Sequence, residues 1–208
     1  MIAIVDYGVG NLFSLKCSFA AIGVDAAVTG DAAVLHEAER ILLPGVGAFG
    51  DAAAKLRESG LDRVVIEEAK AGKPLLGVCV GMQLLFERGF EYGEHAGLGL
   101  VPGEVRHIGE FIPAGLKIPQ IGWNALHLVK SSCPLFRYTK EGDYVYFVHS
   151  YAGFDCADST AATVEYGAAL TAAVQRGNIF GTQFHPEKSG RVGLNILRAF
   201  TEWEGTTC

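Results

Sequence analysis

A cysteine lies between two glycines, where a predicted strand meets a predicted helix. The segment Gly77-Val78-Cys79-Val80-Gly81 has the nucleophile-elbow pattern, with Cys in place of Ser. In such a turn the central residue is strained, and glycines flank it because side chains there would collide with neighbouring backbone. The turn exposes Cys79 at a helix N-terminus, whose dipole favours a thiolate. The pattern predicts a nucleophile; a buried cysteine in a glycine-rich turn is the alternative.

A histidine and a glutamate stand two residues apart in Gln183-Phe184-His185-Pro186-Glu187, at the end of another predicted strand. On an extended stretch such side chains point in roughly the same direction, and Pro186 fixes one backbone angle between them. A free thiol gains from an adjacent base. His185 can take the thiol proton and later protonate a leaving amine, while Glu187 holds the imidazole tautomer. The two segments together predict a Cys79–His185–Glu187 triad.

A third segment, Pro44-Gly45-Val46-Gly47, follows a short apolar run that reads as a strand. Glycines there let backbone N–H groups face a ligand with no side chain between them. Such donors form an oxyanion hole, and we expect them at Val46 and Gly47, with the N–H of Val80 as the second donor. Taken alone, the segment is equally typical of an ordinary strand-to-helix turn.

Strands and helices alternate over the first 90 residues. Apolar runs predict strands at 2–5, 41–43 and 74–78, and helical spacing predicts helices at 11–23, 51–60, 61–71 and 82–87, the first capped by Asn11. Shorter strands are expected at 98–101, 104–108, 144–148, 162–165 and 170–175, followed by a buried strand at 178–184 and a helix at 190–203. This order predicts an α/β fold, with a mostly parallel central sheet flanked by helices and added antiparallel strands. No linker divides residues 1–208, so we expect one domain.

Composition excludes several classes of protein. The formal net charge is −6, which leaves no basic footprint for nucleic acid. Half of the residues are hydrophobic and 19% are charged, which excludes disorder. No run of 18 apolar residues and no basic leader occur, so we expect neither a membrane span nor a signal peptide. The five cysteines lack a C-x-x-C pair, which suits a reducing compartment; they are Cys17, Cys79, Cys133, Cys156 and Cys208.

No motif for a metal or a cofactor is complete. No cluster of His, Asp, Glu or Cys has metal-ligand spacing. Gly8-Val9-Gly10 begins a dinucleotide fingerprint, but Phe13 stands where the third glycine is required. We expect a cytoplasmic enzyme that needs neither.

The three chemical segments, in their order and spacing, resemble the class I glutamine amidotransferase family over most of the chain. Four further segments are similar, within that family, to glutaminase subunits of imidazole glycerol phosphate synthase, of histidine biosynthesis. They are Asp6–Leu12, Gly122–Asn124, Tyr146–Tyr151 and Gln183–Ser189. Val80 stands where Leu is frequent and Gln120-Ile121 where His-Met is frequent, and neither departure removes a group of the triad.

The resemblance implies a reaction and further site residues. Cys79 would attack the carboxamide of L-glutamine, release ammonia and leave a glutamyl thioester for water to hydrolyse. By the same analogy Gln83 steers the carboxamide, Glu91 meets the amino group, and the segment around Ser150 meets the carboxylate. From position alone, Gln83 lies about one helical turn past the nucleophile.

A partner is also implied. The resemblance indicates a 1:1 heterodimer with a (β/α)₈-barrel cyclase subunit, which uses the ammonia to make imidazole glycerol phosphate and AICAR. Candidate contact residues near the nucleophile by motif position are Asn11, Trp123 and Lys188. A core tryptophan and a solvated lysine are the alternatives for the last two.

Other functions remain open at this point. The chain could be the glutaminase of a different amidotransferase pathway, or another Cys-triad hydrolase such as an esterase or a peptidase. A non-catalytic scaffold is a third alternative, although loss of a triad residue would be its mark, and Cys79, His185 and Glu187 are all present. His149, in the segment Tyr146–Tyr151, is the only other histidine in a suggestive position.

Overall fold

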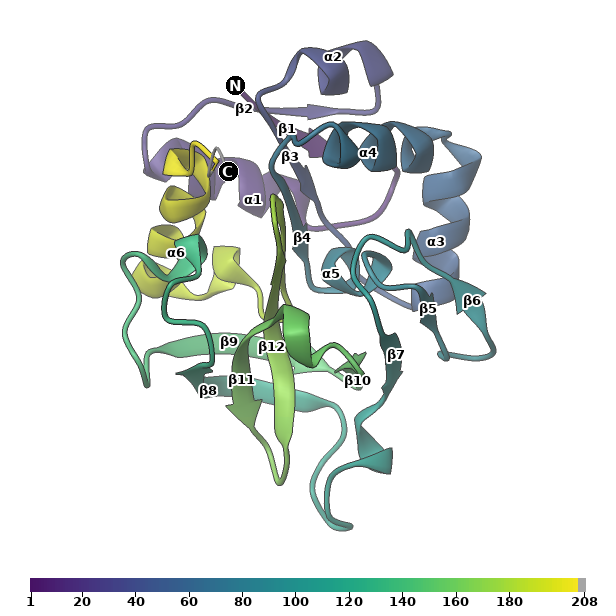
Figure 1. Ribbon diagram of the computed structural model, residues 1–208, viewed down its shortest axis with the longest axis vertical. Coiled ribbons are helices and arrows are strands. Elements are labelled where there is room, and N and C mark those ends of the chain that lie inside the picture. The colour runs from purple at the N-terminus through teal and green to yellow at the C-terminus, as the bar shows by residue number, and fades with distance from the viewer. Residues whose placement is uncertain (206–208) are drawn as a thin grey trace.

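The computed structural model describes residues 1–205, whose strands form two sheets (Figure 1). Within this part of the chain the larger sheet has nine strands in the order β2-β1-β3-β4-β13-β12-β11-β8-β9. These are Ala26–Thr29, Ile2–Val5, Arg40–Leu43, Leu75–Val78, Ile179–Thr182, Ala169–Arg176, Thr160–Glu165, Gln120–Leu128 and Tyr144–His149, respectively. The smaller sheet has the order β10-β7-β5-β6, formed by Tyr151–Phe154, Glu104–His107, Arg88–Gly89 and His95–Ala96.

One half of the large sheet is parallel and the other antiparallel. Strands β2, β1, β3, β4 and β13 pair in parallel, whereas β12, β11, β8 and β9 each pair antiparallel to their neighbour. Every residue of β1, β4 and β13 is buried, as expected of parallel strands covered on both faces. The predicted α/β fold with added antiparallel strands is therefore confirmed.

Helices cover both faces of the parallel half (Figure 1). Helices α1 (Leu12–Ala21) and α6 (Gly190–Glu202) contact each other on one face. Helices α2 (Ala32–Glu37), α3 (Phe49–Glu58), α4 (Leu61–Lys70) and α5 (Val80–Leu84) lie on the other. Short 3₁₀ turns at Ile108–Glu110, Pro134–Phe136, Ala157–Ser159 and Pro186–Lys188 complete the elements.

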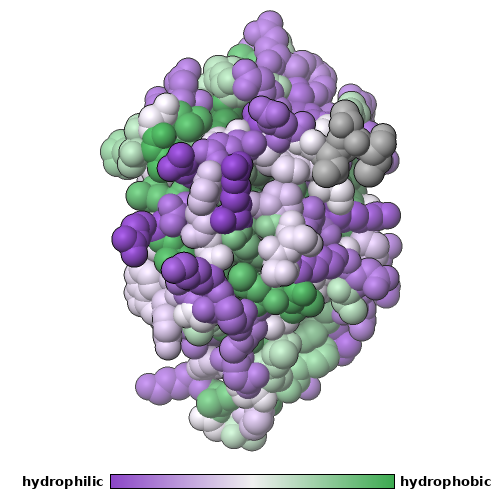
Figure 2. Space-filling model, turned by 60° about the vertical axis from the view of Figure 1, so that its left-hand side comes forward, coloured by the Kyte–Doolittle hydropathy of each residue, from purple (hydrophilic) through white to green (hydrophobic). Residues whose placement is uncertain are grey.

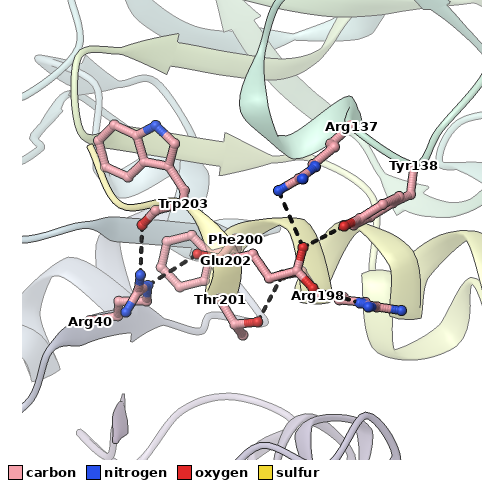
Figure 3. A network of polar contacts seen from close by, with 8 residues as sticks. All are labelled: Arg40, Arg137, Tyr138, Arg198, Phe200, Thr201, Glu202 and Trp203. Carbon is pink, nitrogen blue, oxygen red and sulfur yellow. Dashed lines mark hydrogen bonds and ion pairs between the residues drawn. The ribbon is translucent and has the colours of Figure 1, made fainter. Parts of the chain in front are cut away.

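The C-terminal end of α6 is fixed by a network of polar contacts (Figure 3). Glu202 accepts hydrogen bonds from the Tyr138 hydroxyl at 2.5 Å and from Nε of Arg198 at 2.7 Å. Arg40, at the start of β3, donates to the carbonyl of Trp203 at 2.6 Å. The C-terminal end of the helix is thus tied to β3 through Arg40.

Two of the predicted elements are wrong in detail. Residues 98–101 are not a strand, because their amides bond to carbonyls that the short helix α5 leaves unpaired. Leu98 donates to Leu84 at 2.8 Å, and Val101 donates to Leu85 at 2.9 Å. The helix predicted at 82–87 accordingly begins at Val80 and ends at Leu84.

Other elements were not predicted at all. Their sequences show no clear hydrophobic period, because most are short and β8 is partly exposed with an irregular burial pattern. They are strands β2, β5, β6, β8 and β10 and helix α2. The four-stranded second sheet was therefore not predicted either, because β5, β6 and β10 belong to it. Asn11 occupies the N-cap position of α1, but its side chain makes no capping bond.

The surface carries both polar and apolar residues. Figure 2 shows one side of it, where hydrophobic residues form separate patches among hydrophilic ones. In residues 1–205 no helix combines the length and the apolar character needed to cross a membrane. Cys17 is exposed, Cys133 and Cys156 are buried, and Cys208 lies outside the described residues.

Candidate active site

Three neighbouring parallel strands end side by side and bring the chemical segments together. Leu43 of β3 pairs with Gly77 of β4, which pairs with Gly181 of β13. Each strand is followed by one of the segments: residues 44–47 after β3, Cys79 after β4, and His185 after β13. Open parallel sheets bind ligands at this carboxyl edge.

Cys79 occupies a strained turn between β4 and α5. Its backbone has φ 55° and ψ −115°, a left-handed φ that non-glycine residues rarely adopt. Its N–H donates to the carbonyl of Thr182 at 2.8 Å, which ties the turn to the neighbouring strand. A Cβ on Gly81 would lie 2.0 Å from the carbonyl oxygen of Leu43, so this position must be glycine. The elbow geometry expected from the sequence is present.

A pocket of about 350 Å³ opens over Cys79. Nine of the residues that the sequence analysis proposed line it: Val46, Gly47, Cys79, Val80, Gln83, Glu91, Ser150, His185 and Lys188. Pro119, Val148, His149 and Tyr151 complete the lining. Glu187 lies behind His185 and does not line this pocket, and neither do Asn11 and Trp123.

His185 and Glu187 form a buried pair. Nδ1 of His185 lies 2.8 Å from Oε1 of Glu187, and the side chains are 4% and 1% exposed. Burial lowers the pKa of His185, but the hydrogen bonds and charges of Cys79 and Glu187 outweigh it and raise the pKa to about 9. The expectation that both residues lie on an extended stretch is wrong. Glu187 lies in the 3₁₀ turn Pro186–Lys188, which folds its carboxylate back to the ring.

A buried serine holds the histidine turn. The hydroxyl of Ser189 donates to the carbonyl of His185 at 2.6 Å and accepts from the N–H of Tyr146 at 3.0 Å. The N–H of His185 donates to the carbonyl of Tyr146 at 3.0 Å. Sequence reasoning gave Ser189 no role. A hydroxyl residue directly before a predicted helix suggests an N-cap, but the Ser189 side chain makes no capping bond to α6 and bonds to the histidine turn instead.

The expected oxyanion donors lie at the pocket wall. Gly47 has φ 85°, so the loop turns through a conformation that suits glycine. Val80 is the first residue of α5, where N–H groups have no intrahelical acceptor. The hydroxyl of Tyr7 donates to the carbonyl of Pro44 at 2.7 Å and anchors this loop. Burial, and after it the nearby Cys79, raise the pKa of Tyr7, which keeps the phenol protonated as a donor.

The residues expected to bind glutamine take different positions in the pocket. Gln83 is 3% exposed, and its Nε2 donates to the carbonyl of Tyr151 at 3.0 Å. Glu91 accepts from the N–H of Phe49 at 2.7 Å, so it serves the N-terminus of α3 as a cap. This contact explains why α3 begins at Phe49 and not at Asp51.

Ser150 and His149 lie at the junction of β9 and β10. Ser150 is a half-buried bend residue between the two strands. His149 is 6% exposed, and its Nδ1 donates to the carbonyl of Tyr151 at 2.9 Å. Burial lowers the pKa of His149 to about 4, so its ring is neutral. Beside His185, it is a packed polar residue of the pocket wall.

Two of the three expected contact residues gather at one aromatic ring near the pocket. Trp123 is 51% exposed, and its ring packs edge-on against Tyr146, with 6.1 Å between ring centroids. Nζ of Lys188 lies 5.8 Å from the same Tyr146 ring. Asn11 is the N-cap residue of α1, a helix that contacts the Pro186–Lys188 turn.

No group of His, Cys, Asp or Glu in residues 1–205 is arranged to hold a metal ion. The pocket instead offers a thiol, an imidazole and amide donors, and these suit acyl transfer through a covalent intermediate.

Comparisons with known proteins agree over nearly the whole chain. Residues 3–202 match the family Glutamine amidotransferase class-I. The "Imidazole glycerol phosphate synthase subunit HisH" of Oceanobacillus iheyensis is 47% identical over 204 residues, which cover 97% of this chain and 98% of that protein. The protein of the same name from Lactiplantibacillus plantarum is 48% identical over 204 residues, covering 97% and 95%.

A solved structure shows the same fold. "Structure of PurLQS from Thermotoga maritima" superposes with a TM-score of 0.75 at 21% identity and covers 96% of each chain. The match of 200 residues to the family, together with relatives near 47% identity, is decisive: this chain belongs to the class I glutamine amidotransferase family.

Proposed function

We propose that this chain is the glutaminase subunit of imidazole glycerol phosphate synthase, and that residues 1–208 act as one catalytic domain. It hydrolyses L-glutamine to glutamate and ammonia through Cys79, His185 and Glu187. The observation that carries the proposal is the shared pocket of Cys79 and His185, with Glu187 hydrogen-bonded behind the ring at 2.8 Å.

The first half of the reaction forms a thioester. The Cys79 thiolate attacks the carboxamide carbon, and the C=O electron pair moves to oxygen. The N–H of Val80 and a loop N–H from Val46 or Gly47 stabilise that oxyanion. His185, charged at neutral pH with a pKa of about 9, donates its proton to the nitrogen. The C–N bond then breaks, and ammonia leaves.

The second half regenerates the enzyme. Neutral His185 takes a proton from water, and the hydroxide attacks the thioester carbon. The C–S bond breaks, Cys79 leaves as a thiolate, and glutamate departs. Glu187 fixes the ring so that Nε2 faces the thiol, because Nδ1 is committed to Oε1 at 2.8 Å.

The pocket wall suits the three polar ends of glutamine. Gln83 lies within one helical turn of Cys79, where it can orient the carboxamide. The carboxylate of Glu91 lies at the pocket wall, where it can meet the α-amino group. Ser150 lines the same space and can meet the α-carboxylate.

The partner is a (β/α)₈-barrel cyclase subunit in a 1:1 cytoplasmic heterodimer. Ammonia released into water is protonated and diluted. Direct transfer to the partner keeps it as neutral, nucleophilic NH₃. The relatives named as subunits of imidazole glycerol phosphate synthase support the pathway, which makes imidazole glycerol phosphate and AICAR in histidine biosynthesis. The exposed Trp123 and the Lys188 cation near the pocket give this partner an aromatic and a charged contact, and Asn11 adds a third.

The decisive experiment measures ammonia release from glutamine, with and without the cyclase subunit and its ligand. We expect Cys79→Ala to abolish hydrolysis, His185→Ala to be nearly as severe because such groups act as a unit, and Glu187→Gln to be milder. Synthesis from added ammonia should survive Cys79→Ala.

A matched control is available at another thiol. Cys17 is exposed on α1, so Cys17→Ala should keep full glutaminase activity. Normal hydrolysis by Cys79→Ala would refute the triad. Release of products from ester or peptide substrates, with no ammonia from glutamine, would instead indicate another Cys-triad hydrolase.

A further inference from the structure

A buried glutamine lies against the nucleophile. Gln183, directly after β13, is fully buried, and its Nε2 lies 3.9 Å from Sγ of Cys79. Its backbone N–H donates to the carbonyl of Ala172 at 2.8 Å, which fixes the residue to the neighbouring strand. Neither the triad nor the pocket lining includes this side chain.

A backbone carbonyl determines which end of the Gln183 amide faces the sulfur. The Tyr151 carbonyl can only accept, so the side chain of Gln83 must present its nitrogen there, at 3.0 Å. The same nitrogen lies 3.0 Å from the Gln183 side chain, and the Gln183 atom facing a donor must be its oxygen. The Gln183 nitrogen is therefore the end that points at Cys79.

We propose that Gln183 is a further residue of the catalytic site: its side-chain amide donates a hydrogen bond to the Cys79 thiolate and holds the sulfur toward the pocket. This rests on the proposed function. A hydrogen bond to the charged form of a group favours that form. The thiolate exists before attack and again when the thioester breaks, so one donor serves both halves of the reaction without transferring a proton.

Gln183 also positions Gln83. Both hydrogens on Nε2 of Gln83 are used, one by Tyr151 and one by Gln183. Oε1 of Gln83 is then the atom left to accept from the carboxamide nitrogen of glutamine. The amide chain thus sets both the nucleophile and the residue that orients its target.

The test follows the alkylation of Cys79 by iodoacetamide against pH, read by mass spectrometry of the peptide that contains it. Gln183→Met keeps the side-chain length but removes the donor. We expect the pH profile of alkylation to move up by about one pH unit, with roughly tenfold slower alkylation at pH 7. Glutamine turnover should fall by about the same factor, with a smaller change in KM.

A matched control is Gln175→Met on β12, a half-buried glutamine outside the site. It should keep the wild-type pH profile and turnover. Thermal unfolding, followed for every variant, separates a local effect from loss of fold.

A folded Gln183→Met variant with the wild-type alkylation profile would overturn the proposal. Should that variant not fold, Gln183→Glu is measured instead: it keeps the acceptor for Gln83 but presents a negative oxygen to the sulfur, and an unchanged profile there is equally decisive. If the wild type releases no ammonia from glutamine even with the cyclase subunit and its ligand, the proposed function is refuted. Alkylation needs no turnover, so its pH profile still decides the role of Gln183.

Discussion

The buried ring of His149 gives a stability measurement with a calculable size. Burial lowers its pKa to about 4 from an ordinary 6.5. The folded protein therefore leaves the ring neutral between those pH values, whereas the unfolded chain binds a proton. Stability from this residue is complete above pH 6.5 and is lost as the pH falls toward 4, by about 1.4 kcal/mol per pH unit. Between pH 7.5 and 5 the loss amounts to about 2 kcal/mol.

The measurement is urea unfolding, followed by circular dichroism at pH 7.5 and pH 5. The wild-type free energy of unfolding should fall by about 2 kcal/mol more than that of His149→Gln, whose amide can still donate to the Tyr151 carbonyl and does not titrate. His127→Gln removes a half-exposed histidine that pairs with Glu141 and should retain the larger wild-type fall. If wild type and His149→Gln lose stability in parallel, the ring is not held neutral by burial and the reasoning fails.

Four further substitutions test the site. Tyr7→Phe removes the donor to the Pro44 carbonyl. It should lower the free energy of unfolding in urea by about 1 kcal/mol and slow glutamine turnover. Unaffected turnover would mean that the loop needs no anchor. Gly47→Pro removes a loop donor and also distorts the loop, because proline cannot adopt the φ of 85° found there. Turnover should fall by roughly 100- to 1,000-fold with less change in glutamine affinity. A collapse of binding at normal saturated turnover would assign the loop to substrate binding. Trp123→Ala and Lys188→Ala should each weaken the cyclase complex, or its activation of glutamine hydrolysis, by about tenfold while the fold is kept; titration calorimetry that gives wild-type affinity for both, with normal coupling, contradicts the interface.

The sequence predicted what depends on short segments. The Gly77–Gly81 elbow is local, because a strand, a strained residue and flanking glycines suffice to specify it. The alternation of strands and helices predicted the parallel half of the sheet except for β2, and the family resemblance was confirmed over residues 3–202. The roles of Cys79, His185 and Glu187 stay predictions, although the structure brings all three together.

The features that could not be predicted from the sequence depend mostly on contacts between distant segments. The N-terminus of α3 is capped by Glu91, 42 residues further along the chain, so no local pattern revealed its start. Gln83 and Gln183 lie 100 residues apart, and only the pairing of β13 beside β4 joins their side chains. Asn11 had the residue type of a helix cap, yet backbone angles of φ −89° and ψ 59° accompany a side chain that does not cap.

The position of β13 has a consequence for how the chain folds. It is the last strand of residues 1–205, yet it lies inside the sheet between β4 and β12. During synthesis about a hundred residues follow β4 before β13 emerges, and until then the edge of β4 that pairs with β13 has no partner. Exposed strand edges promote aggregation of incompletely folded chains. Because β13 also carries His185 to Cys79, insertion of this strand is the step that makes the catalytic site. Recovered enzymatic activity in refolding should therefore report the final closure of the sheet.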